Sequence, residues 1–84
     1  MTSILMNRTR SRIIRFLLRN GPSTCSAIGS SLGVSPSAIH RQIALLRCAG
    51  LVEPTAGARF TASPDQIMRE IEAIAATFTI EVKR

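Results

Sequence analysis

The feature that most constrains the fold is a three-residue corner, Gly33-Val34-Ser35, between two helical patterns. Before the corner, Ile28 and Leu32 lie four residues apart, as on the buried edge of a short helix. After it, Ser35 can cap a second helix, and Pro36 occupies the first turn of that helix, where a missing N–H is harmless. A connection of this length leaves room only for a sharp turn. We therefore expect two short helices packed at a steep angle.

Two further helices are predicted, one on each side of this pair. The first carries an apolar stripe at intervals of three and four residues and stops at Asn20-Gly21-Pro22. The members of the stripe are Ile13, Ile14, Leu17 and Leu18. A last helix is predicted over residues 64–79, because Ser63-Pro64-Asp65 supply a cap, a first-turn proline and an acid for the positive helix end.

The apolar period changes between the corner pair and the last helix. Two short β-like runs, 51–54 and 59–61, flank the turn Thr55-Ala56-Gly57-Ala58 and predict a hairpin. The expected fold class is therefore mainly α with a small β-hairpin. A chain of 84 residues suffices for one small domain. We expect that domain to span 1–84, with a core unit at 8–61 and the last helix at 64–79.

Charge is distributed unevenly along the sequence, whose formal net charge is +6. Through Arg59, eight arginines stand against one glutamate, which gives +7. From Phe60 onward, three basic residues stand against four acidic ones, which gives −1. A basic body attracts a polyanion, and nucleic acid is the commonest one. We therefore expect double-stranded DNA as a partner.

Candidate DNA contacts lie near the start of the helix that follows the corner. Ile39, Ile43 and Leu46 share one face of that helix, so the opposite face is free to meet a partner. Arg41 can form a forked pair with a guanine, and Ser37 and His40 can donate to bases or phosphates. The candidates on this helix are Ser35, Pro36, Ser37, His40, Arg41 and, further round, Gln42. We add Arg59 in the hairpin and Arg15 in the first helix as possible backbone contacts.

The run from Arg8 to Phe60, and above all LGVSPSAIHRQIALLRCAGLV, resembles the winged helix-turn-helix domains of ArsR-like transcriptional regulators. MarR-like proteins are a more distant comparison. The resemblance covers about residues 8–61 and implies that the helix over Ser35–Ala49 enters the DNA major groove as the recognition helix. It also implies a hairpin that touches flanking backbone and terminal helices that form a homodimer. The expected function is a sequence-specific, double-stranded DNA-binding transcriptional regulator, with repression as the expected direction.

The last helix carries an apolar stripe that predicts the dimer interface. Its members are Ile67, Ile71, Ile74 and Phe78. Two such helices packed about a two-fold axis would bury these side chains. The alternative is that the stripe folds back onto the core of its own chain. Ile4, Leu5 and Met6, at the other end of the chain, could contribute to either arrangement.

Several classes of function are not expected. One histidine, no paired carboxylates and no glycine-rich phosphate loop argue against an enzyme. Cys25 and Cys48 match no metal-ligand spacing, so we expect two buried thiols, no metal and no cofactor. No apolar run approaches the ~20 residues of a membrane span. Since the N-terminus does not look like a secretory signal either, a cytoplasmic location without membrane contact is expected.

Two alternatives to DNA binding stay open. The first is a winged-helix module that docks onto another protein, because a fold does not fix a function. That alternative predicts an apolar or acidic outer face on the recognition helix. The second is a metal-responsive ArsR-like sensor. Many such sensors carry two cysteines flanking one residue in the preceding helix, whereas Thr24-Cys25-Ser26 holds one.

Overall fold

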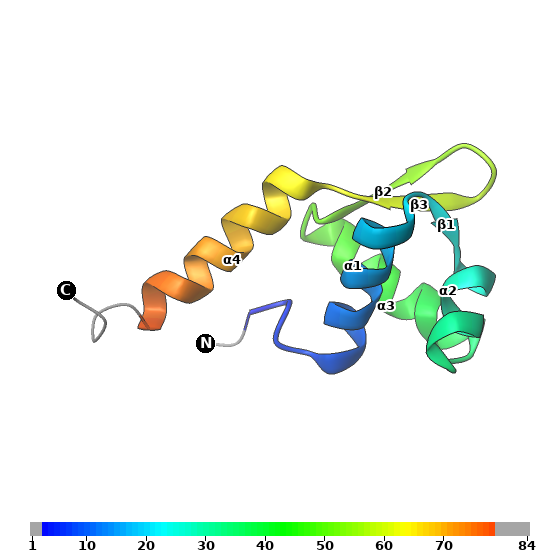
Figure 1. The fold of residues 1–84 in the computed structure, drawn as a ribbon, viewed down its shortest axis with the longest axis horizontal. Coiled ribbons are helices and arrows are strands. Elements are labelled where there is room, and N and C mark those ends of the chain that lie inside the picture. The colour runs from blue at the N-terminus through cyan, green and yellow to red at the C-terminus, as the bar shows by residue number, and fades with distance from the viewer. Residues whose placement is uncertain (1–2, 79–84) are drawn as a thin grey trace.

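A computed structural model of the chain describes residues 3–78 (Figure 1). Four helices and three short strands make up the described part of the chain. Their order is α1 (Arg8–Asn20), β1 (Ser23–Thr24), α2 (Cys25–Leu32), α3 (Pro36–Cys48), β2 (Val52–Thr55), β3 (Arg59–Ala62) and α4 (Pro64–Phe78). The mainly helical class and the hairpin are confirmed. None of the helices in the described part of the chain is long and apolar enough to span a membrane.

Helix α1 begins at a cap that was not predicted from the sequence. The Asn7 side chain, through Oδ1, accepts a hydrogen bond from the Arg10 amide at 3.0 Å and so satisfies one free N–H of the first turn. Ile13 and Leu17 are buried as predicted, but Leu18 is 51% exposed. The prediction that Leu18 belongs to the buried stripe was wrong. Leu18 lies about 100° further around the helix than Leu17, so its side chain falls outside the face that contacts the core.

Helices α2 and α3 meet at the predicted corner, and each has a side-chain cap. Thr24 Oγ1 accepts from the Ala27 amide at 3.1 Å, and Ser35 Oγ accepts from the Ala38 amide at 3.2 Å. Gly33 ends α2 in the left-handed region, at φ 72°, which a residue with a Cβ enters only at a cost. Gly33 and the Ser35 cap together allow α2 to end and α3 to begin within three residues.

Gly29 allows the corner to close tightly. It lies buried in α2, and its carbonyl accepts a hydrogen bond from the Val34 amide at 3.0 Å. A Cβ at position 29 would collide with the Val34 carbonyl oxygen and would lie 3.5 Å from Ile39 Cγ1. The first contact is with backbone, which cannot move aside without shifting the start of α3. A side chain at position 29 would therefore push α2 and α3 apart.

The sheet has a third strand that periodicity did not predict. Its strand order is β1-β3-β2, with both pairings antiparallel. Ser23 pairs with Phe60, and Thr24 pairs with Arg59, which places β3 in the centre. A two-residue strand is too short to show a period, so it could not be recognised in the sequence. Pro54 is tolerated in β2 because β2 is an edge strand.

The core gathers one apolar face from each helix and the start of β2. Its buried members are Ile13, Ile14, Leu17, Ile28, Ile39, Ile43, Leu46, Leu51, Val52 and Ile67. Ile67 is 3% exposed and belongs to the core of its own chain, so its placement in a dimer interface was wrong. Beyond Ile67, α4 leads away from the other helices (Figure 1), and Ile71 is 46% exposed. Ile74 is half-buried, and the side chain of Phe78 lies outside the described residues.

The segment before α1 lies against both the core and α4. Ile4 and Leu5 pack against the core, whereas Met6 is exposed. Ser3 Oγ donates a hydrogen bond to Glu70 Oε2 at 2.6 Å and so ties this segment to α4. Most of the apolar residues in this N-terminal segment are thus covered by the rest of the same chain.

We expect Gly29→Ala to destabilise the fold by about 1–3 kcal/mol, the usual cost of overpacking a close contact. A loss of stability would be informative, because alanine stabilises a helix by about 1 kcal/mol relative to glycine where space allows. Ser30→Ala is the matched control, since Ser30 is exposed in the same helix and its change should be neutral or slightly stabilising. Urea denaturation of both variants measures the difference. A Gly29→Ala variant as stable as Ser30→Ala would contradict the close approach.

Candidate nucleic-acid interface

The outer face of α3 gathers most of the predicted DNA contacts. Ile39, Ile43 and Leu46 point into the core and are at most 1% exposed. The residues on the opposite side of the first two turns are all exposed, and they are Ser35, Pro36, Ser37, His40 and Arg41. The first helical turn also presents backbone N–H groups, which attract anions. This part of α3 therefore offers donors and a cation at one exposed surface, which we call the α3 outer face.

Gln42 lies apart from that surface. It is half-buried, and its Oε1 accepts a hydrogen bond from Arg10 Nη1 at 3.0 Å. Arg10 Nε also donates to the Ile4 carbonyl at 2.7 Å, so one guanidinium joins α3, α1 and the N-terminal segment. Gln42 thus holds α3 against α1 and does not extend toward a ligand. This structural role of Arg10 was not predicted from the sequence, because it depends on a partner 32 residues away.

The hairpin of β2 and β3 forms the wing. Arg59 lies in β3, the central strand of the sheet, next to the hairpin turn. It is exposed, and its backbone pairs with Thr55 on one side and with Thr24 on the other. A Cβ at Gly57 would lie 3.6 Å from Arg59 Nη1, so the guanidinium lies close to the turn. The wing therefore carries one exposed arginine at its tip, in the position predicted for a contact with flanking backbone.

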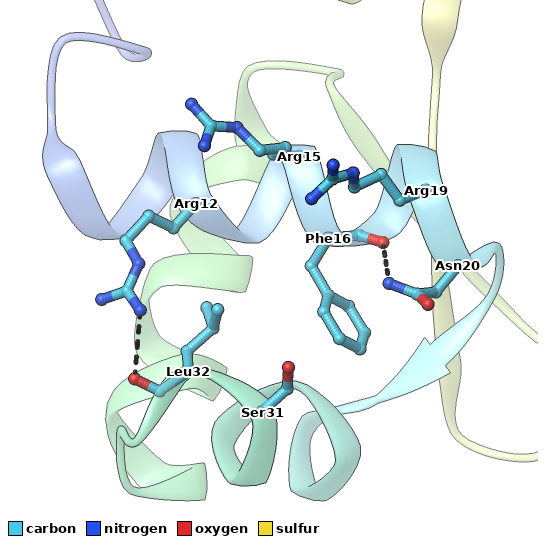
Figure 2. Close-up of a pocket in the computed structure, with 7 residues that line it drawn as sticks. All are labelled: Arg12, Arg15, Phe16, Arg19, Asn20, Ser31 and Leu32. Atoms are coloured by element: carbon cyan, nitrogen blue, oxygen red, sulfur yellow. Dashed lines mark hydrogen bonds between the residues drawn. The ribbon is translucent and has the colours of Figure 1, made fainter.

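Arg15 lies on a different surface. Because Ile13, Ile14 and Leu17 turn one side of α1 into the core, exposed Arg15 occupies the other side. There it lines a cavity of about 290 Å³ between α1 and α2 (Figure 2). The other lining residues are Arg12, Phe16, Arg19, Asn20, Ser31 and Leu32. The structure therefore does not bring Arg15 together with the α3 outer face.

A sequence model of the family described as "Helix-turn-helix domain" matches residues 5–55, which is more than half of the chain. The chain belongs to this family. The helix-turn-helix domain carries the additional β-sheet wing described above, so its fold is the winged form. None of the curated proteins matches the sequence.

Two solved structures resemble the helix-turn-helix chain over most of its length. One is described as a "Possible transcriptional regulator for arsenical resistance", with a TM-score of 0.77 and 26% identity, covering 93% of this chain and 82% of the other. The other is the AntR antimony-specific transcriptional repressor, with a TM-score of 0.67 and 19% identity, covering 95% and 76%. Together with the family match, these structures support an ArsR-like winged helix-turn-helix domain. The chain is a DNA-binding transcriptional regulator.

The two thiols of this helix-turn-helix regulator differ in environment. Cys25 is half-buried at the start of α2, and burial raises the pKa of its thiol. Cys48 is exposed in the last turn of α3, so the expectation of two buried thiols was wrong for it. The helix turns Cys48 to the side opposite Ile39 and Ile43. Within residues 3–78, no three histidine, cysteine or carboxylate side chains are grouped so that they could hold a metal ion.

We expect zinc to leave DNA affinity unchanged in the wild type and in the variants Cys25→Ser and Cys48→Ser. The reason is that a structural zinc site needs about four ligands, and neither thiol has such a set around it in the described chain. Fluorescence titration of a labelled duplex with and without added zinc measures this. The finding of one equivalent of tightly bound zinc that depends on either cysteine would show that a site exists.

Proposed function

We propose that the chain is a homodimeric repressor that reads double-stranded DNA by placing α3 in the major groove. The observation that carries this proposal is the exposed pair His40–Arg41 on the α3 outer face, opposite the buried Ile39 and Ile43. Recognition helices present base-reading side chains in this part of the helix. A protein-docking module would instead present an apolar or acidic surface here. The polar and basic character of this face favours DNA.

The roles of the individual residues follow from their chemistry. Arg41 can donate two parallel hydrogen bonds to O6 and N7 of a guanine, the commonest specific contact in the major groove. Ser37 and His40 can donate to base edges or phosphates beside it, and the first turn of α3, capped by Ser35, favours a phosphate. Arg59 at the tip of the wing would meet the flanking backbone. Gln42 and Arg15 are not part of the proposed interface.

The proposed dimer uses the part of α4 beyond the core. Ile71 is exposed and Ile74 is half-buried, and they share the side of α4 on which Ile67 enters the core. The periodicity of the sequence adds Phe78 to this side. One recognition helix contacts only a few base pairs, so useful specificity calls for two helices about 34 Å apart on a pseudo-palindromic site. A second copy covering the outer part of α4 would supply the other helix.

The direction of regulation is proposed by analogy with the antimony-specific transcriptional repressor. A dimer bound across an operator excludes other proteins from that DNA. The ligands in the names of the two similar structures are not carried over. The chain has two cysteines, and no metal-binding group of His, Cys, Asp or Glu forms within its described residues.

We expect duplex affinity to fall steeply with salt, and Arg41→Ala to cost about 1–3 kcal/mol on the preferred site. The loss should be smaller on other sequences, because the forked contact is made only to the correct base. Duplexes selected from a random pool by the wild type would supply the preferred site. Fluorescence anisotropy at several salt concentrations measures both effects.

Arg15→Ala is the matched control for Arg41→Ala, since it removes the same charge from the other side of the motif. Its effect should be smaller and equal for all sequences. An Arg41→Ala variant that weakens every sequence equally would show that Arg41 reads no base. Absence of duplex binding at low salt would refute the proposed function and favour protein docking.

We expect the double substitution Ile71→Asp with Ile74→Asp to convert the dimer to monomer and to weaken operator binding. Burying one large apolar side chain is worth about 1.5–3 kcal/mol, and each aspartate adds a charge that resists burial. Analytical ultracentrifugation measures the mass, and circular dichroism checks the fold. Arg69→Asp changes the net charge by the same two units on another side of α4 and should stay dimeric. A wild-type chain that sediments as a monomer at micromolar concentration would disprove the dimer.

A further inference from the structure

The cavity between α1 and α2 has a lining that the proposed function does not use. Three of its residues are arginines, namely Arg12, Arg15 and Arg19, and none of its lining residues is acidic. The carboxylates of the described chain lie elsewhere, with Glu53 in β2 and the other three in α4. Close guanidinium groups repel one another, and a bound anion would relieve that repulsion. The cavity is therefore an electropositive recess without a counter-charge of its own.

One arginine is already held in place at the edge of this recess. Arg12 is half-buried, and its Nη2 donates to the Leu32 carbonyl at 3.3 Å, across the gap between α1 and α2 (Figure 2). Arg15 and Arg19 are exposed, and neither side chain makes a hydrogen bond or an ion pair with another residue of the range 3–78. The guanidinium of Arg15 points away from α2 (Figure 2). Because neither side chain has a partner among these residues, both can turn toward a ligand in the cavity, beside Arg12, whose position is fixed.

Apolar surface lies between the charges. The ring of Phe16 points from α1 toward α2, and the side chain of Leu32 lies beside it, with both residues half-buried (Figure 2). The Ser31 hydroxyl points into the same space from α2 (Figure 2). A volume of about 290 Å³ holds a small organic molecule but not a folded partner. The lining thus matches a ligand that has both an anionic group and a compact apolar body.

This recess faces away from the proposed DNA interface. The arginines lie on the side of α1 opposite Ile13 and Leu17, and the core separates them from α3. His40 and Arg41 lie on the far side of α3, opposite Ile39 and Ile43. Two charged surfaces on opposite sides of one small core cannot both lie against the same groove of a duplex. The charge on α1 therefore needs another explanation.

We propose that the cavity between α1 and α2 binds a small organic anion, with its carboxylate or phosphate group at Arg15 and Arg19 and its apolar part on Phe16 and Leu32. Guanidinium groups suit this role because their planar forks pair with both kinds of anion. The proposal does not depend on DNA binding. Phenyl phosphate is the probe that combines the two features, and inorganic phosphate and benzyl alcohol each carry one of them.

Isothermal titration calorimetry of the full chain tests the site. Phenyl phosphate should bind one equivalent per chain, with inorganic phosphate at least tenfold weaker and benzyl alcohol showing no saturation. The double variant Arg15→Gln with Arg19→Gln should lose at least tenfold in affinity for phenyl phosphate. It should keep its fold by circular dichroism, because neither side chain makes a hydrogen bond within the described chain.

A matched double variant separates a built site from general attraction to a basic protein. Arg8→Gln with Arg69→Gln removes two charges outside the cavity and should change the affinity by less than twofold. Equal losses in the two double variants, or no saturable binding by the wild type, would overturn the proposal. The same variants titrated with duplex DNA give a further check. If Arg15→Gln with Arg19→Gln weakens duplex binding as much as Arg41→Ala does, the cluster contacts DNA phosphates and the proposal is wrong.

Discussion

The close approach of α2 to α3 at Gly29 determines how α3 presents its outer face. The Val34 carbonyl occupies the space that a side chain at position 29 would need, and Ile39 packs directly against the same point. With this contact in place, Ile39 and Ile43 turn inward, and His40 and Arg41 necessarily turn outward. The chemistry of the α3 outer face thus depends on a residue that has no side chain and no role in binding.

The same core divides the exposed arginines of α1 and α3 between two surfaces. α1 turns Ile13 and Leu17 inward, so its exposed arginines lie on one side of the molecule, while α3 places Arg41 on the other. Net charge alone would have assigned all of these arginines to DNA. The burial pattern separates a candidate reading surface from a candidate anion site, because an amphipathic helix can present only one face to a given partner.

The sequence predicted the elements of this fold well because their signals are local. The cap at Ser35, the corner at Gly33 and the hairpin after Gly50 each depend on residues within a few positions of one another. The features that escaped prediction depend on distant partners.

Three residues illustrate this limit. Gln42 was assigned to DNA, but it is engaged by Arg10 in another helix. Ile67 was assigned to the dimer, but the core accepts the first turn of α4. Ser23 forms a strand only because Phe60 lies opposite it. Periodicity specifies which face of an element is apolar, but not which of several neighbours will cover it.

Thr24 has a mechanical consequence for how the molecule meets a partner. Its backbone pairs with Arg59 in the wing, while its side chain caps α2. The wing is therefore joined to the helical body through β1 as well as through the chain segments that connect it to α3 and α4. A displacement of the wing must either break this pairing or carry the start of α2 with it. The wing and the first turn of α2 are consequently coupled through the two-residue strand β1, so that one cannot shift without the other.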